Sequence, residues 1–369
     1  MTAPQFEIQL IAVVVAVSCA LPGTFLVLRR MAMMSDAISH SILFGIVVAF
    51  FVVRDLSSPF LVVAAALTGV LTVSLVELLN RTGLVREDAA IGLTFPALFS
   101  VGVILVSRYA GSVHLDTDSV LLGELAFAPF NRLAVMGYDI GPRAFYLMAG
   151  IMLLNILFIA VFYKELKLAT FDASLAGVLG FLPGFLHYAL MALVSVTAVG
   201  AFDAVGSILV VALMIAPPTT AYLLVDRLSL MLAVSALLGA VSAISGYWIA
   251  HVLDASIAGS MASMAGLLFG AAYLAAPGRG LIAITVRRVR QRWKFAQTML
   301  LVHLYNHEGL PAEVRENRIP TLHEHLKWDH RFAERVVAAA GRQGLVESRD
   351  RRLLLTDRGR RAAREAMVG

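Results

Sequence analysis

The sequence has little charge and almost no cysteine. Only 15% of its 369 residues are charged, whereas 59% are hydrophobic; a soluble domain usually has about 25% charged and about 45–50% apolar residues. One soluble core cannot hide this much apolar surface, so a bilayer must be part of the solvent. The single cysteine, Cys19, lies in an apolar run, which excludes a disulfide or a cysteine-based zinc site within the chain.

The sequence also lacks the common motifs of ATPases and zinc proteases. It contains neither a Gly-x-x-x-x-Gly-Lys-Ser/Thr phosphate loop nor a His-Glu-x-x-His segment. We therefore expect no catalytic activity and no permanently bound cofactor, and any ATP hydrolysis would belong to a partner chain. No basic residue precedes the first apolar run, so we interpret that run as a retained helix rather than a cleaved signal peptide.

Nine apolar stretches are long enough to cross the roughly 30 Å of a bilayer's hydrocarbon, which takes about 20 helical residues. They cover approximately 6–28, 33–53, 58–79, 88–108, 143–163, 184–202, 205–225, 229–252 and 257–277. Basic residues follow the first, third, fifth, seventh and ninth stretches. This pattern predicts a multi-pass protein of the bacterial inner membrane with its N-terminus outside and its C-terminal domain in the cytoplasm.

The charge changes sign at Pro277-Gly278, where the apolar runs stop. Residues 1–277 hold 11 basic and 15 acidic side chains, and residues 278–369 hold 19 and 10. We predict a membrane domain over 1–277, a basic juxtamembrane linker over 278–295 that suits anionic lipid, and a cytoplasmic domain over 296–369.

The C-terminal tail, residues 296–369, has the hydrophobic pattern of a soluble domain. Helical patterns occur near 296–307, 320–327 and 329–342, two β-like runs follow at 345–347 and 353–355, and a last helix begins near Asp357. Three helices followed by a hairpin predict a winged helix-turn-helix. The fold class is thus an all-α polytopic membrane protein with a small winged-helix domain. Two histidine pairs, His303/His307 and His323/His325, have a spacing that metal binding permits, although surface histidines are the commoner case.

The most informative polar residues are Asp36 and His40, which open the second apolar stretch. They are four residues apart, so they share one helix face. Ionisable groups within a membrane span are costly and usually face protein or water. A carboxylate with an imidazole suits Mn²⁺, Fe²⁺ or Zn²⁺. The alternative is a structural pair, with Asp36 as the cap of the helix.

Other candidates are weaker. His114 and Asp116 in the outer loop either place donors at an entrance or belong to a solvated loop. Asp203, at the tip of a tight hairpin around 201–203, is either a turn residue or an acidic group near the outer mouth. Pro217 and Pro218 interrupt the seventh stretch, and such prolines either form a kink that acts as a hinge or are simply tolerated.

The inner loop contains an apolar segment over 171–182 that predicts a short helix with a face of small residues. Its residues of interest are Phe171, Asp172, Ala173, Ala176, Gly177 and Gly180. A short cytoplasmic helix between two spans is suited to docking into a groove on a partner protein.

Several segments, in order, resemble the metal-type ABC permeases, the membrane subunits of zinc, manganese and iron importers. They are residues 28–40, 87–92, 163–180, 205–217 and 220–224. The resemblance implies a second permease subunit, a cytoplasmic ATPase that contacts the 171–182 helix, and an extracytoplasmic metal-binding protein. It also implies that Asp36 and His40 meet the ion in its pathway. The tail resembles the winged-helix domains of metal-dependent repressors, although a membrane-tethered domain is not expected to bind nucleic acid.

Two other functions remain open for this sequence. One is a membrane-tethered metal sensor with the tail as its output domain, and the other is a proton- or sodium-coupled carrier. The 171–182 helix favours the importer, because only an ATP-coupled system needs a docking site for an ATPase. Manganese is the favoured cargo because a hard carboxylate accompanies the imidazole and no thiol is nearby; zinc and iron are the alternatives.

Overall fold

The computed structural model describes residues 3–54, 59–109, 125–135, 138–310, 316–317, 322–349 and 352–368. The chain divides into two compact units, Met1–Pro277 and Gly278–Gly369. Within the described residues of the first unit, nine helices are long and apolar enough to cross a membrane. They are α1 (Ala3–Leu28), α2 (Met33–Val53), α3 (Pro59–Arg81), α4 (Glu87–Tyr109), α6 (Arg143–Val161), α9 (Pro183–Val205), α10 (Ser207–Leu224), α11 (Leu228–Leu253) and α12 (Ile257–Ala275). The nine predicted spans are confirmed.

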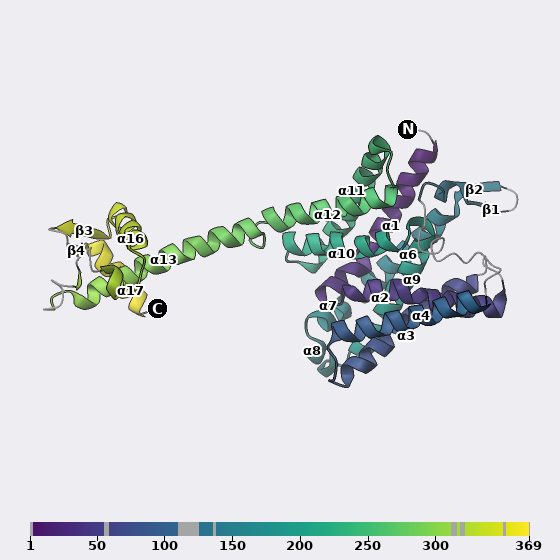
Figure 1. Ribbon diagram of the computed structural model, residues 1–369, viewed down its shortest axis with the longest axis horizontal. Helices are drawn as coiled ribbons and strands as arrows, with labels where there is room; N and C mark the ends of the chain where they lie inside the picture. Colours follow the sequence, from purple (N-terminus) through teal and green to yellow (C-terminus); the bar gives the residue numbers. More distant parts are fainter. Residues whose placement is uncertain are drawn as a thin grey trace. The chain divides into compact units, whose positions relative to one another are not determined.

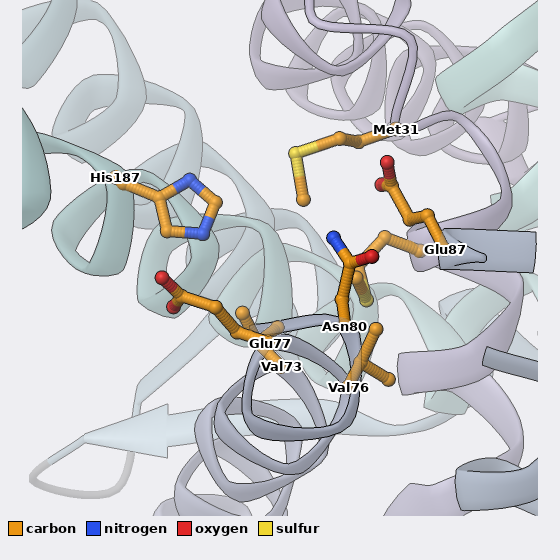
Figure 2. A pocket seen from close by; sticks show the side chains of 8 residues that line it. Met31, Val73, Val76, Glu77, Asn80, Glu87 and His187 are labelled. Atoms are coloured by element: carbon orange, nitrogen blue, oxygen red, sulfur yellow. The ribbon is translucent and has the colours of Figure 1, made fainter. Parts of the chain in front are cut away.

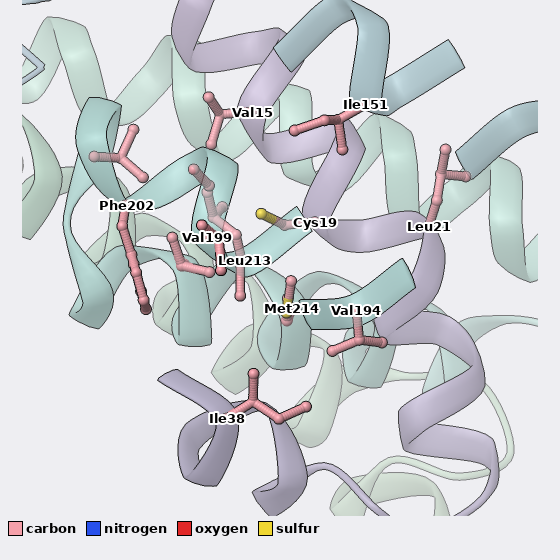
Figure 3. Packing of buried hydrophobic residues seen from close by; sticks show 14 of the residues in the cluster. Val15, Cys19, Leu21, Ile38, Ile151, Val194, Val199, Phe202, Leu213 and Met214 are labelled. Carbon is pink, nitrogen blue, oxygen red and sulfur yellow. The ribbon is translucent and has the colours of Figure 1, made fainter. Parts of the chain in front are cut away.

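Helix α1 is central in this unit. It packs against α6, α9, α10 and α11 (Figure 1), and most of its length is buried. Cys19 lies in the middle of this core, among apolar side chains of α1, α9 and α10 such as Val15, Val199 and Leu213 (Figure 3). An inert, buried thiol of this kind acts as a small apolar side chain.

A few buried polar groups join the helices. The Asn155 side chain on α6 donates to the Ser18 carbonyl of α1 at 3.0 Å and to the Thr197 hydroxyl of α9 at 3.1 Å. The hydroxyls of Thr72 and Ser41 lie 2.6 Å apart and join α3 to α2. Hydrogen bonds between membrane helices contribute about 0.6 kcal/mol each on average, so these bonds fix the register of helices that apolar contact alone would leave free to slide.

The turn between α9 and α10 differs from the prediction. Helix α9 continues to Val205, and the chain turns at Gly206, which has a φ of 79°. The tight turn predicted between these two spans is therefore present, but it lies at Gly206 and not around 201–203. Glycine adopts such a positive φ without strain. Helix α10 continues through Pro217 and Pro218, both of which are buried, so the two prolines do not end the helix; a kink at this point stays a prediction.

The segment before α6 contains a hairpin that the all-α prediction missed. Strands β1 (Arg132–Val135) and β2 (Tyr138–Pro142) pair antiparallel after a short helical turn at Ala128–Phe130. Arg132 forms ion pairs with Asp139 across the hairpin and, at 3.3 Å, with Glu7 of α1. These pairs tie the hairpin to the first turns of the central helix.

The second unit has its own small core. Helix α13 (Leu281–His307) is followed by α15 (Leu322–His325), α16 (His330–Arg342), the antiparallel strands β3 (Val346–Arg349) and β4 (Arg352–Leu355), and α17 (Asp357–Val368). Buried apolar side chains from these elements, including Leu300, Val336 and Leu353, pack together. The order of elements is the predicted one, and α13 passes without a break through the predicted linker boundary at residue 295. Its identity as a winged helix stays a prediction.

Candidate ion pathway

Asp36 and His40 lie one turn apart on α2. The N-cap position of this helix is Ala32, so Asp36 is not the cap that the alternative interpretation proposed. The Nε2 atom of His40 is 3.4 Å from Oδ1 of Asp36, and both side chains remain about one-third exposed, at 36% and 32%. The two donor groups therefore face the same space, as their spacing predicts.

That space is a cavity of about 170 Å³ between α2 and α10. Asp36 and His40 form one wall, and Ser207, Ile208 and Val211 form the other. The opposite wall belongs to the first turns of α10, directly after the Gly206 turn. A hydroxyl, a carboxylate and an imidazole thus line one small chamber within the membrane unit, and these groups provide oxygen and nitrogen ligands for a divalent cation.

Two aromatic rings of α4 hold the His40 imidazole. Phe95 stacks on it with ring centroids 5.7 Å apart, and Phe99 meets it edge-on at 6.2 Å. The rings restrict the rotamers of His40 and shield one side of it from solvent. The sequence did not single out these two residues, although their separation by four positions on one helix was a usable signal.

A second cavity, of about 220 Å³, lies among the ends of α2, α3, α4 and α9. Its walls carry Glu77, Asn80, Glu87 and His187, together with the Met31 thioether (Figure 2). Figure 2 shows the side chains of Glu77 and His187 on one side and that of Glu87 on the other, with Asn80 between them. The chamber therefore has an acidic lining at these helix ends.

The acidic group of Glu77 is partly neutralised. Arg81, one turn further along α3, lies 2.5 Å from its Oε1, and the Tyr188 hydroxyl donates to its Oε2. These contacts fit a structural role for Glu77 as well as a place in the cavity wall. The convergence of Glu77, Glu87 and His187 was invisible in the sequence because they come from three helices.

The inner loop forms two helices where one was predicted. Helix α7 (Tyr163–Phe171) ends at Phe171, and α8 (Ala173–Val178) follows at once. Asp172 caps α8 by accepting a hydrogen bond from the Leu175 amide at 2.9 Å. Gly180 has a φ of 84°, which ends the helical path, so the short helix predicted over 171–182 is present as α8 but covers fewer residues than expected.

The exposed side chains of this loop are large and apolar. Val178 is 84% exposed, Leu182 is 70% exposed and Phe171 is 64% exposed. By contrast, Ala176 is buried, while Ala173 and Gly177 are exposed but small. Any partner would therefore contact a patch of apolar side chains rather than the predicted face of small residues.

Five other positions were predicted from the sequence. His114 and Asp116 lie outside the described residues. Asp203 falls in the last turn of α9, and its side chain is outside the described part of the chain. Pro217 and Pro218 lie inside α10 and line neither of the two cavities.

Comparison with known proteins assigns the family. The model of the ABC 3 transport family matches residues 5–276, nearly all of the first unit. The chain is 48% identical over 353 residues to the zinc transport system membrane protein TroD of Treponema pallidum, with 96% of each chain covered. It is 49% identical over 290 residues to the manganese transport system membrane protein MntD of Bacillus subtilis, covering 78% of this chain and 98% of that one. A solved structure, PsaBC from Streptococcus pneumoniae in complex with Fab, matches with a TM-score of 0.64 and 28% identity over 77% of this chain and 96% of that chain. The chain therefore belongs to the ABC 3 transport family.

Proposed function

We propose that this chain is the permease subunit of an ATP-binding-cassette importer for a divalent transition-metal ion, and that Asp36 and His40 contact the ion in transit. The observation that carries the proposal is the chamber between α2 and α10, in which a carboxylate and an imidazole one turn apart face the Ser207 end of α10. Two strong ligands bind an ion without holding it as firmly as the four ligands of a structural site. A transporter needs such a site, because the ion must leave again.

The cargo is manganese or zinc. A hard carboxylate beside an imidazole, with no thiol available, favours manganese, and the MntD relative is named for that metal. The TroD relative is named for zinc and is almost equally similar. Uptake of each metal by cells that lack competing importers decides between them.

The partners follow from the exposed surfaces. The apolar patch of Phe171, Val178 and Leu182 on the inner loop would dock a cytoplasmic ATPase. A second permease subunit would complete the pathway across the inner membrane, and an extracytoplasmic binding protein would deliver the ion. The basic stretch of residues 287–294 would contact anionic lipid.

Arg29 offers a route by which the ATPase could act on the ion site. It lies in the turn between α1 and α2, a few residues before Asp36. Its Nε donates to the Thr170 hydroxyl of α7 at 3.1 Å, and its Nη1 lies 3.5 Å from the His187 ring on α9. Displacement of α7 and α8 by a docked ATPase would therefore pull on the segment that leads into the ion-binding turn of α2.

The test is metal uptake by cells that express the complete importer with Asp36→Asn or His40→Ala. The first change removes the charge but keeps the shape, and the second removes the imidazole. We expect accumulation of manganese or zinc to fall to background, with normal amounts of protein in the membrane.

His251→Ala is the matched control, because His251 is an exposed histidine near the end of α11 that lines neither cavity. It should transport as the wild type does. Normal uptake by the Asp36→Asn and His40→Ala proteins would remove the pathway role of this pair.

A further inference from the structure

Three donor side chains converge in the second unit, away from the chambers described above. His303 and His307 lie one turn apart near the end of α13, with ring centroids 4.5 Å apart. Glu316 follows in the chain, and its Oε2 lies 2.7 Å from Nε2 of His307. One candidate ligand atom from each residue lies within 4.8 Å of the others. All three residues are partly buried, and the side chains of His307 and Glu316 are only 25% and 23% exposed.

The hydrogen bonds of His307 define which of its nitrogens faces the carboxylate. Its Nδ1 lies 2.8 Å from the carbonyl oxygen of His303. A carbonyl only accepts, so Nδ1 carries a proton and donates it. In the neutral ring, Nε2 then presents a lone pair to the carboxylate of Glu316, and two acceptors at this distance need a cation between them. That cation is a second proton on His307, or a metal ion that replaces this proton and moves the two atoms apart to the roughly 3.3 Å that separates two ligands lying about 2.1 Å from a tetrahedral ion.

His303 supplies a second lone pair to the same place. Its Nε2 is buried and has no hydrogen-bond partner among the described residues. Burial first, and then the neighbouring His307, lower the pKa of His303. Buried polar atoms without partners are rare and usually indicate a water molecule or an ion that completes the site.

The position of Glu316 is fixed from the other side. The carbonyl of Asn317 accepts a hydrogen bond from the Leu353 amide of β4 at 2.9 Å. The Asn317 side-chain oxygen is itself buried and unpartnered within the described residues. This backbone hydrogen bond to the β3–β4 hairpin holds the segment that carries the Glu316 carboxylate close to α13. The three donor groups are therefore positioned by the fold of the second unit.

We infer that His303, His307 and Glu316 form a binding site for a divalent transition-metal ion in the C-terminal unit. Two histidines and a carboxylate are a common ligand set for zinc and also suit manganese or ferrous iron. The Nδ1–H to carbonyl bond of His307 is the usual outer contact of a metal-binding imidazole. His325, whose ring stacks on that of His303 with centroids 6.1 Å apart, is placed to approach a fourth position.

A bound ion would have a structural consequence. The ion would cross-link Glu316 to the last turns of α13. Because Asn317 is hydrogen-bonded to β4, the ion would also connect α13 to that strand. The second unit would then be more rigid when the metal is bound. This inference does not depend on the proposed ion pathway, since it uses no residue of the first unit.

The test uses the full-length chain, purified in detergent without an affinity tag, and carrying Asp36→Asn and His40→Ala to remove the pathway pair. Equilibrium dialysis against Zn²⁺ should give one tightly bound ion per chain. Adding Glu316→Gln or His303→Ala should weaken that binding by at least about 10-fold, as loss of a ligand or its close support does. Bound Co²⁺ should show the visible absorption of a tetrahedral site in the parent chain but not in these two variants.

His330→Ala is the matched control, because His330 and Glu334 form an exposed His–Glu pair at 3.3 Å on α16. It should bind Zn²⁺ as the parent does. Melting curves in the presence of a chelator should coincide for parent and variants, which excludes misfolding as the cause. Absence of bound Zn²⁺ in the parent chain, or unchanged binding after Glu316→Gln and His303→Ala, would show that His307 and Glu316 form only a protonated ion pair and would overturn the inference. Neither result bears on uptake through Asp36 and His40, which is measured separately.

Discussion

Replacing Gly23 with alanine measures how closely α1 must approach α10. A Cβ atom at this position would lie 2.1 Å from the carbonyl oxygen of Met214 and 2.9 Å from its carbonyl carbon. Carbon and oxygen atoms in contact normally stay at least about 3.3 Å apart, and both obstructing atoms belong to the backbone. The helices would therefore have to separate by roughly 1 Å at their crossing, because no side-chain rotation relieves the overlap.

The cost follows from two opposing terms. Overpacking of this kind destabilises by about 1–3 kcal/mol, while alanine stabilises a helix relative to glycine by about 0.5–1 kcal/mol. We expect a net loss of about 1–2 kcal/mol and a lower melting temperature in detergent. Metal uptake should fall as well, since the first turns of α10 form a wall of the Asp36 and His40 chamber.

The control is Gly150→Ala in α6, where an added Cβ would meet nothing within 4 Å. It should melt at or slightly above the temperature of the wild type. The melting temperature can be followed by intrinsic fluorescence on purified protein, and Gly23→Val should be worse than Gly23→Ala. If Gly23→Ala is as stable as the wild type, or if Gly150→Ala loses as much, the close approach of α1 and α10 does not limit the fold.

Two further changes test other contacts. Asn155→Leu removes hydrogen bonds from α6 to α1 and α9 and should destabilise the purified protein by about 1 kcal/mol in thermal unfolding. The control is Ser245→Ala, because the Ser245 hydroxyl donates to a carbonyl of its own helix, and this variant should keep the stability of the wild type. Equal losses of stability in the two variants would contradict the role of Asn155. Val178→Asp puts a charge on the apolar inner-loop patch and should reduce co-purification of the ATPase and transport, whereas Val178→Leu should retain both. Unchanged co-purification after Val178→Asp would move the docking surface elsewhere.

The membrane spans could be predicted because each one is a long and almost uninterrupted apolar run in the sequence. A run of about 20 apolar residues has few alternatives to a membrane helix, and the helix limits in the structure lie within a few residues of those expected. The position of the turn between α9 and α10 was predicted a few residues too early, because the composition changes at residues 201–203 whereas the chain turns at Gly206. Pro217 and Pro218 do not end α10, because neighbouring helices can cover freed backbone groups, which lets prolines remain inside a membrane helix.

The sequence predicted which polar residues share a helix face but not which residues of other helices face them. The i, i+4 spacing of Asp36 and His40 placed both groups on one face, and the structure keeps them 3.4 Å apart. Nothing in that spacing indicated that the facing wall begins at Ser207, because this depends on how α10 packs. The hairpin of β1 and β2 was missed for the same reason, since its anchor is an ion pair between Arg132 and Glu7, far apart in sequence.

The two proposed metal sites differ in a way that matches different tasks. The pathway pair offers two donors that are each about one-third exposed in an open chamber, so a bound ion would keep several water ligands and exchange readily. The C-terminal cluster offers three donors, one of them a buried nitrogen with no hydrogen-bond partner in the described part of the chain, so loss of the ion would leave an unsatisfied polar atom that costs about 1–3 kcal/mol. Retention is therefore favoured at the C-terminal cluster and release at the pathway pair. On this reasoning the C-terminal site should fill first as the free metal concentration rises. Metal titration of the full-length chain and of the two sets of variants should resolve two binding components. The tight component should be lost with Glu316→Gln and the weaker one with Asp36→Asn.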